Sequence, residues 1–204
     1  MKLYFSPFAC SLASHIVMNE LGMTFESVPV NLQTHHYKGG DFYAVNPKGY
    51  VPALEMSNGE VLTEGSAILQ YLADQKPETH LIPKAGTMER YRCQEWLNFI
   101  ATEIHKGMGP LWKADLPEES RNMIKTMLGK RFDYLTGALK SHDFLMGKQY
   151  TVADAYLFTI LNWAPMLKID LTKWPALMGF MERVKTRPAV AKTLQTEGAM
   201  ANRH

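Results

Sequence analysis

Cys10 is the first residue of this chain whose type and position could do chemistry. It follows Ser6-Pro7-Phe8-Ala9, directly after the short apolar run Leu3-Tyr4-Phe5, and it opens a helical pattern that continues to Glu20. The positive end of a helix dipole favours a thiolate over a thiol, so a cysteine placed there has a lowered pKa and a raised reactivity. The alternative is a buried cysteine that packs as a small apolar side chain. Position alone leaves both interpretations open.

A second group with chemical potential is Glu64-Gly65-Ser66, where a predicted strand gives way to a predicted helix. Backbone amides and the helix dipole attract a carboxylate at such a turn, while the Glu64 side chain can bind an ammonium group. One turn therefore suits an α-amino acid head. The alternative is an ordinary acidic residue at a helix N-terminus.

Asn98, Glu103 and His105 form a third group, on one long predicted helix. Asn98 and His105 are seven residues apart, nearly two turns, so we expect them to share a face and to line one cleft. Taken alone, a histidine on a helix is more often a residue of the surface or the core edge than a catalyst.

The elements that must position these residues divide the chain in two. Strand, helix and strand patterns at Leu3–Phe5, Cys10–Leu21 and Phe25–Val30 predict a βαβ unit with a parallel pair. A polar loop follows from Asn31 to Asp41. Two apolar runs, 51–56 and 60–63, then flank Ser57-Asn58-Gly59, which predicts an antiparallel hairpin, and a helix begins at Glu64.

Every later segment has the helical period. The helices are predicted at Thr87 to about Lys106, Glu118–Ser141, Thr151 to about Trp163, Trp174–Thr186 and Pro188–Glu197. Pro77, Pro83 and Gly86 mark a linker. We therefore predict an α/β domain over 1–76, a linker over 77–86 and an all-α domain over 87–204. Thr151-Val152-Ala153-Asp154 is interpreted as a helix capping box that serves stability.

The bulk composition excludes several classes of function. The chain has 22 Lys and Arg and 20 Asp and Glu, and its basic residues are dispersed along the sequence. This pattern does not predict nucleic-acid binding. No apolar run approaches the roughly 20 residues that cross a bilayer. Cys10 and Cys93 form neither a disulfide framework nor a metal site with recognised spacing, so we expect no metal and a reducing compartment. The short, Pro7-interrupted apolar start predicts mature cytoplasmic protein rather than a signal peptide.

Several motifs, in order and at matching spacing over nearly the whole chain, resemble those of cytosolic glutathione S-transferases. They are Asn46-Pro47-Lys48-Gly49, Val51-Pro52-Ala53-Leu54, Leu62–Ile68 and Tyr71–Asp74. Ala9–His15, Trp96–Ile100 and Glu103–Gly107 resemble the bacterial beta class in particular. The resemblance implies a thioredoxin-like βαβ-ββα domain followed by an all-helical domain, a homodimer, and glutathione as co-substrate.

The resemblance also gives roles to residues. It implies a cis Val51-Pro52 bond, with the Val51 main chain holding the cysteinyl part of glutathione like an added strand; the alternative is the plain start of an edge strand. Glu64, Gly65 and Ser66 would hold the γ-glutamyl end, although Gly65 lacks the hydroxyl of the serine that other classes carry. Asn98 and Glu103 would border the glutathione site, and His105 would lie close to Cys10.

The loop departs from the family pattern at His35 and His36, where similar proteins often carry lysines that contact the glycine carboxylate. A neutral imidazole donates one hydrogen bond without a full charge, so we expect weaker or more pH-sensitive glutathione binding. The alternative is an exposed polar loop with no role.

The predicted function is conjugation of reduced glutathione to small apolar electrophiles, a detoxification reaction, in a pocket formed with the helical domain. A cysteine where other transferases carry Tyr or Ser also allows thiol-disulfide exchange through Cys10. The alternative is a non-catalytic module that binds apolar ligands or another protein, since one fold hosts many functions. Trp163, Met108, Leu111 and Trp112 are predicted as apolar lining or core.

Overall fold

The computed structural model describes residues 1–201 and divides into two compact units. Met1–His80 and the C-terminal segment from Thr186 form the first unit, and Leu81–Lys185 form the second. Each unit is described by itself. The helical domain predicted over 87–204 thus contributes its last helix to the first unit, and residues 202–204 lie outside the described range.

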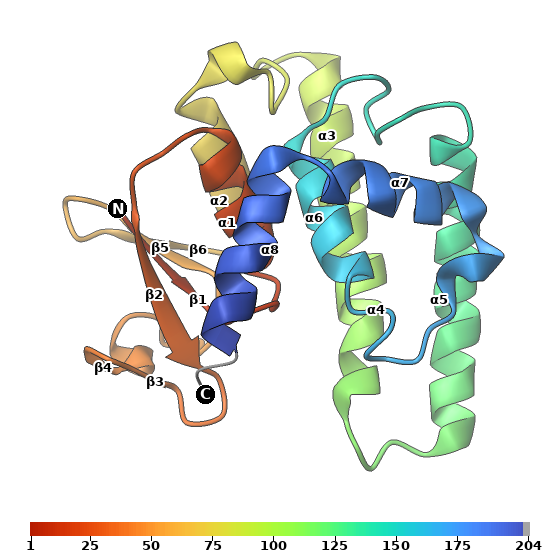
Figure 1. The fold of residues 1–204 in the computed structure, drawn as a ribbon, viewed down its shortest axis with the longest axis horizontal. Helices are drawn as coiled ribbons and strands as arrows, with labels where there is room; N and C mark the ends of the chain where they lie inside the picture. The colour runs from red at the N-terminus through yellow and green to blue at the C-terminus, as the bar shows by residue number, and fades with distance from the viewer. Residues whose placement is uncertain (202–204) are drawn as a thin grey trace. The chain divides into compact units, whose positions relative to one another are not determined.

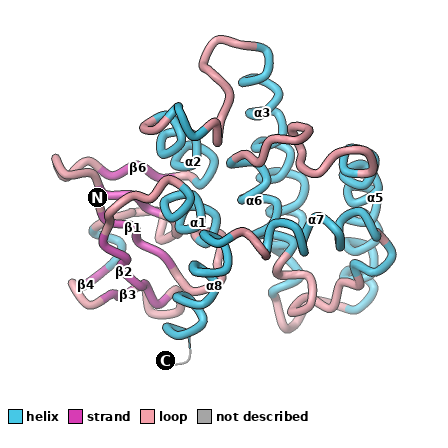
Figure 2. Tube along the Cα trace, turned by 45° about the horizontal axis from the view of Figure 1, so that its top comes forward, coloured by secondary structure: helices cyan, strands magenta, loops and turns pink. Residues whose placement is uncertain are grey.

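The first unit is built on a six-stranded sheet with the order β4-β3-β2-β1-β5-β6. β1 pairs with β2 in parallel, and all other neighbouring pairs are antiparallel. Figure 2 shows every named strand of residues 1–201 gathered in this unit. The strands are β1 (Lys2–Phe5), β2 (Glu26–Asn31), β3 (His36–Tyr37), β4 (Gly40–Asp41), β5 (Ala53–Glu55) and β6 (Val61–Thr63).

This sheet confirms the predicted parallel pair and the predicted hairpin, in which Ala53 of β5 lies opposite Thr63 of β6. It also corrects one prediction, because the loop predicted over 31–41 contains β3 and β4. Each of these strands has only two residues, too few for an alternating pattern to be read.

Three helices pack in the first unit: α1 (Leu12–Glu20), α2 (Gly65–Asp74) and α8 (Pro188–Ala201). α1 lies between the other two, since it contacts both α2 and α8 (Figure 1). Every residue from Leu12 to Met18 is therefore buried, as expected of a helix covered on several sides. Two short 3-10 turns complete the unit, at Phe42–Ala44 and Pro77–Thr79.

Side chains alternate between the two faces of the sheet, as the pleat requires. Tyr4, Val28 and Val30 join Phe42 and Val51 in one buried cluster. Leu3 and Phe5, the neighbours of Tyr4 on β1, are fully buried as well. Both faces of β1 are covered, so this strand is held rigidly in the core. It therefore fixes the position at which the turn that carries Cys10 begins.

The second unit is helical, as predicted. Its main helices are α3 (Met88–Phe99), α5 (Glu118–Leu139), α6 (Val152–Leu161) and α7 (Pro175–Lys185). α6 is buried along its whole length and contacts α3 and α7. In Figure 1, α3 and α5 are the long green helices of this unit.

The helix predicted over 87–106 is not α-helical throughout. After α3 the chain forms a π-helical segment, Ile100–His105, and then the short α4 (Lys106–Met108) and a 3-10 turn at Gly109–Trp112. π-helical segments are rare and occur frequently at functional sites. This one carries Glu103 and His105, two of the predicted site residues.

Candidate active site

Cys10 lies in the turn between β1 and α1 and is partly buried. Its Sγ donates a hydrogen bond of 3.1 Å to the main-chain oxygen of Val51. α1 begins at Leu12 with Ser11 as its N-terminal cap, so Cys10 directly precedes the helix. The structure therefore joins two predicted site residues that are 41 positions apart in the sequence.

The turn that carries Cys10 is hydrogen-bonded to α8. Phe8 has a left-handed φ of 59°, which is uncommon for a residue with a side chain. Its backbone N–H donates a 2.7 Å hydrogen bond to Oε2 of Glu197, a fully buried carboxylate. The other oxygen of Glu197 lies 2.8 Å from Nδ1 of His15 on α1. One buried acidic group thus links the Cys10 turn to two helices.

Val51 and Pro52 are joined by a cis peptide bond, as predicted, and both residues are buried. Pro52 lies next to the start of α2, because a Cβ added at Gly65 would lie 3.9 Å from its Cγ. The pairing of β5 with β6 brings these segments together. Cys10, Val51, Pro52 and Gly65 are therefore consecutive neighbours in space.

Glu64 stands at the N-terminal end of α2 with a φ of 69°. Its side chain accepts no hydrogen bond from the helix, so it is not the ordinary capping residue considered as the alternative. Its carboxylate instead pairs with Lys48, whose Nζ lies 2.5 Å from Oε1. The amides of Gly65 and Ser66 belong to the first turn, where the helix supplies no carbonyl to accept from them. An anion can bind at this end of α2.

The two histidines of the loop have different surroundings. His36 Nδ1 lies 2.7 Å from the carbonyl oxygen of Thr34 and must donate to it, which leaves Nε2 of the neutral ring as an acceptor. His35 stacks on Tyr43 with ring centroids 4.6 Å apart, and its Nδ1 is buried without a hydrogen-bond partner. Because Nδ1 has no acceptor, the proton of the neutral ring can be carried on Nε2. Of the pair, His35 is the better donor toward a carboxylate.

Gly49 makes room for this stack. Its φ is +70°, and an added Cβ would lie 2.7 Å from Cε1 of Tyr43 and 3.2 Å from two ring atoms of His35. Both the backbone conformation and the contact with the rings require glycine. The Asn46–Gly49 turn thus connects His35 with Lys48, and through Lys48 with Glu64.

His105 lies in the second unit, within an aromatic group. Its Nδ1 is 2.7 Å from the hydroxyl of Tyr156, and its ring meets Trp163 edge to face at 5.1 Å. Trp163 in turn contacts Trp112, which is half exposed. Burial, with a smaller effect from Lys106, lowers the pKa of His105 to about 4. The imidazole is therefore neutral near pH 7 and can act as a hydrogen-bond donor but not as a cation.

Asn98 and Glu103 do not share the surroundings of His105. Asn98 is exposed at the end of α3, and Glu103 pairs with Arg131 of α5 through hydrogen bonds of 2.7 and 2.8 Å. The π-helical segment explains the difference, since its wider turn takes more residues and rotates His105 away from the face predicted by an α-helical period. The prediction that Asn98 and His105 share one face assumed an α-helical period throughout and did not include this shift in register.

Comparison with known proteins agrees with these features. Residues 5–75 match the family model described as glutathione S-transferase, N-terminal domain, and residues 99–188 match the model of the C-terminal domain. Glutathione S-transferase GstA of Escherichia coli O157:H7 is 46% identical over 199 residues, covering 97% of this chain and 99% of that protein. This chain belongs to the glutathione S-transferase family.

Solved structures narrow the assignment to the bacterial beta class within the family. The beta-class glutathione S-transferase of Sphingomonas chungbukensis has a TM-score of 0.93 and 42% identity, covering 97% of this chain and 99% of that one. A sphingomonad glutathione S-transferase, solved in complex with glutathione, also has a TM-score of 0.93, with 40% identity and the same coverage. The predicted fold and the predicted enzyme class, glutathione transferase, are thus confirmed.

The capping box of this glutathione S-transferase is structural, as predicted. The fully buried Asp154 carboxylate accepts hydrogen bonds from the backbone N–H and hydroxyl of Thr151 and from the backbone N–H of Leu145. Burial nevertheless raises the pKa of Asp154 to about 6. Cys93 is also fully buried, and burial raises the pKa of its thiol to about 11, so this second cysteine is unreactive near pH 7.

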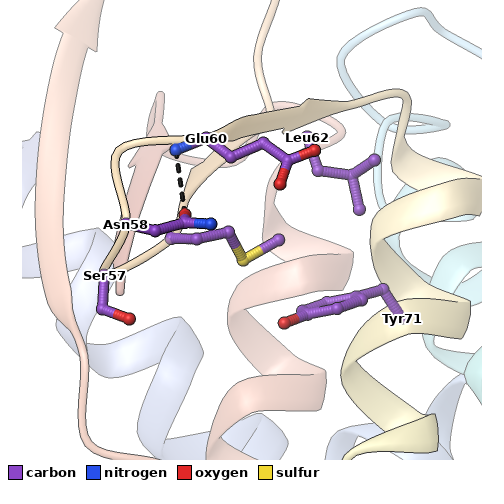
Figure 3. Close-up of a pocket in the computed structure, with 6 residues that line it drawn as sticks. Ser57, Asn58, Glu60, Leu62 and Tyr71 are labelled. Atoms are coloured by element: carbon purple, nitrogen blue, oxygen red, sulfur yellow. Dashed lines mark hydrogen bonds between the residues drawn. The ribbon is translucent and has the colours of Figure 1, made fainter.

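A pocket of about 320 Å³ lies elsewhere in the first unit of the transferase, between the β5-β6 hairpin and α2. Figure 3 shows the ring of Tyr71 facing Glu60 and Leu62 across it. It contains none of the predicted site residues. In residues 1–201, no group of three or more His, Cys, Asp or Glu side chains could hold a metal ion, and no helix is long and apolar enough to cross a membrane.

Four side chains that the sequence did not predict contact or support predicted site residues. Lys48 pairs with Glu64, and Tyr156 lies 2.7 Å from His105. Glu197 bonds to His15 and to the turn that carries Cys10. Glu197 had a detectable signal, because it shares one face of α8 with the buried residues Val190 and Thr193, and an acidic residue in such a stripe needs a partner. Lys48 belongs to the Asn46-Pro47-Lys48-Gly49 motif, but the sequence did not predict a role for its side chain. Its ion pair with Glu64 joins two loops and leaves no trace in local periodicity.

Proposed function

We propose that this transferase binds reduced glutathione along its first unit and transfers it to small apolar electrophiles, as in detoxification. The observation that carries the proposal is the unbroken series Cys10, Val51, Pro52, Gly65 and Glu64, in which each residue lies next to the following one. A sulfur group, the main chain of Val51 and a site for an α-amino acid head then follow in the order of the parts of glutathione.

Each part of the tripeptide has a proposed partner. The main chain of Val51 would hold the cysteinyl residue as an added strand does. Glu64 would take the ammonium of the γ-glutamyl end, with its carboxylate at the amides of Gly65 and Ser66. His35 would donate to the glycine carboxylate from Nε2. Binding that fixes the thiolate beside its acceptor accelerates transfer by proximity and by favouring the charged nucleophile.

We propose a second activity for Cys10, thiol-disulfide exchange. The Cys10 thiolate attacks one sulfur of a mixed disulfide between glutathione and another thiol, forms a bond to the glutathione sulfur and releases the other thiol. A reduced glutathione then attacks this new bond, freeing Cys10 as a thiolate and leaving as oxidised glutathione. The steps balance, because one glutathione thiol enters and the other thiol leaves, while the mixed disulfide is replaced by the disulfide of oxidised glutathione.

The electrophile is proposed to bind the aromatic group formed by Trp112, Trp163, Tyr156 and His105. Its four rings meet edge to face in three pairs, which suits a planar apolar molecule. His105 would serve as a neutral donor there, because its pKa of about 4 keeps the ring uncharged. Asn98 and Glu103 remain proposed contacts of glutathione.

A homodimer in the cytoplasm is also proposed. Large apolar side chains are exposed on α3 and α5, among them Met88, Tyr91, Met127 and Tyr134. Such a surface is a candidate interface, and oligomers of this kind are mostly two-fold symmetric. Both cysteines are free thiols, which agrees with a reducing compartment.

Retention on a glutathione matrix, followed by turnover with the aryl halide 1-chloro-2,4-dinitrobenzene, tests the proposal. We expect both. Retention without turnover, for this and for other electrophiles, would instead favour a non-catalytic binding module. Absence of retention and turnover would contradict both functions.

A further inference from the structure

His105 and Tyr156 share a hydrogen bond inside the second unit. Nδ1 of His105 lies 2.7 Å from the hydroxyl oxygen of Tyr156, and the two rings are nearly perpendicular, at 88°. Tyr156 is 5% exposed, on helix α6, whose residues are all buried, whereas His105 is partly exposed. A hydrogen bond that is shielded from water costs free energy when one partner is lost. The pair therefore fixes the histidine more firmly than a contact at the surface does.

The orientation of the His105 ring has a second support. Trp163 meets the ring edge to face, with centroids 5.1 Å apart and ring planes at 70°. In the part of the chain that the structure describes, Nδ1 is the ring nitrogen that forms a hydrogen bond, and Nε2 forms none. Nε2 is thus the nitrogen of His105 that can bind a ligand.

The chemistry of the pair decides which nitrogen carries the proton. Burial lowers the pKa of His105 to about 4, so the ring is neutral near pH 7 and one nitrogen donates while the other accepts. A phenol is a stronger acid than a neutral imidazole N–H, and the unprotonated ring nitrogen is a stronger base than a phenol oxygen. The Tyr156 hydroxyl therefore donates to Nδ1. The bond at Nδ1 sets the tautomer and leaves the ring proton on Nε2.

We propose that Tyr156 is a positioning residue that holds the His105 proton on Nε2, where it serves electrophiles with a hydrogen-bond acceptor beside the reacting carbon. The inference rests on the proposed function, and it names the class of electrophile and the donating atom. Nitro-activated aryl halides belong to this class. Apolar electrophiles without such an acceptor gain nothing from the Nε2 proton.

The reaction of a nitro-activated aryl chloride shows what this proton does. The glutathione thiolate forms a bond to the carbon that carries chlorine, and a ring electron pair moves onto a nitro oxygen. Nε2–H of His105 donates a hydrogen bond to that oxygen and keeps its proton. The pair then returns to the ring, and chloride leaves with the electrons of its bond to carbon. Because the oxygen is charged only after the thiolate has added, the bond favours the transition state over the bound substrate.

Two electrophiles test this selectivity. 1-Chloro-2,4-dinitrobenzene carries nitro acceptors, and benzyl chloride carries none. Tyr156→Phe, which removes only a hydroxyl, is expected to lower kcat/KM roughly three- to tenfold for the first and less than about twofold for the second. His105→Leu is expected to show the same selectivity with a larger loss, and Tyr156→Phe should cost nothing further when added to it. Tyr71→Phe, on α2 and outside the site, is the matched control.

Nitrogen NMR of the labelled protein near pH 7 tests the tautomer independently of activity. We expect Nδ1 of His105 to show the chemical shift of an unprotonated ring nitrogen and Nε2 that of a protonated one. The Nδ1 signal is expected to move in Tyr156→Phe, because its donor is gone, and to stay in place in Tyr71→Phe.

Two results would overturn the proposal. A proton on Nδ1 in the wild type would mean that Tyr156 accepts from the ring rather than donates to it. Equal losses for both electrophiles in Tyr156→Phe would mean that the hydroxyl supports the fold and not the donor. Failure of the wild type to conjugate either electrophile is a separate outcome. It contradicts the proposed function and the donor role with it, while the nitrogen shifts still decide the tautomer.

Discussion

His15 and Glu197 form a buried pair that ties α1 to α8, with Nδ1 and Oε1 2.8 Å apart and side chains 3% and 0% exposed. The second oxygen of Glu197 receives the backbone N–H of Phe8, two residues before Cys10. Asn19 and Thr193 form a further contact between the same helices, and Glu20 of α1 pairs with Arg187, which directly precedes α8. α8 therefore positions the turn that carries the thiol, although Glu197 and Phe8 are 189 positions apart in the sequence.

The first prediction concerns this support. Glu197→Ala removes both acceptor oxygens, so the backbone N–H of Phe8 and Nδ1 of His15 lose their hydrogen-bond partner. We expect the free energy of unfolding to fall by about 1–3 kcal/mol and the KM for glutathione to rise. Urea unfolding and steady-state kinetics measure the two effects. Gln195→Ala, on the exposed side of α8, is the control, and equal stability of the two variants would contradict the role of Glu197.

Cys10→Ala separates the two proposed activities. We expect reduction of a glutathione mixed disulfide to be abolished, because the attacking sulfur is gone, while conjugation of an aryl halide falls less. Cys93→Ala is the matched control, since the buried Cys93 thiol, with its pKa of about 11, takes no part in either reaction. Loss of both activities to the same extent in Cys10→Ala would exclude separate roles.

His105 makes stability depend on pH. Its folded pKa of about 4 lies below the ordinary 6.5, so the unfolded state binds the proton first as pH falls. The resulting loss in the free energy of unfolding is absent above about pH 6.5. It grows as pH falls toward 4 and reaches about 1–2 kcal/mol at pH 5. Urea unfolding at pH 7.5 and 5.0 should therefore show a smaller loss of stability in His105→Gln than in the wild type.

His142→Gln is the control for that series, because His142 is an exposed histidine of the same unit. It should lose as much stability between the two pH values as the wild type does. A His105→Gln variant that also behaves like the wild type would show that His105 titrates alike in the folded and unfolded states.

The two loop histidines are predicted to differ. His35→Ala removes the ring whose Nε2 can donate outward, so we expect the KM for glutathione to rise several-fold. His36→Ala removes a ring whose Nδ1 is already bonded to Thr34, and we expect a small effect. Equal effects of the two substitutions, measured at the same pH, would count against the assignment of His35 as the carboxylate donor.

The sequence predicted those parts of the fold that are governed by local pattern. The βαβ unit, the hairpin and the helices all have enough residues for their period to be read, and the motif around Val51 and Pro52 gave the cis bond. The π-helical segment could not be predicted, because its six residues are too few for a separate period to be read. The place of α8 was missed because periodicity does not tell a helix which unit it packs against.

The site was predictable where a residue acts through its own type and local element, as with Cys10 and Glu64. It was not predictable where the role depends on a partner distant in the sequence. Glu197 meets Phe8 across 189 positions and Lys48 meets Glu64 across 16. Such contacts depend on tertiary packing, which no spacing rule supplies.

The central claim is that glutathione binds along the first unit with its sulfur at Cys10. A crystal structure of the protein with reduced glutathione tests it most directly. We expect the glutathione sulfur within hydrogen-bond distance of Cys10 Sγ, or at about 2.05 Å if a mixed disulfide has formed, and the γ-glutamyl head at Glu64, Gly65 and Ser66. Glutathione bound with its sulfur away from Cys10, or at a different surface, would contradict the account.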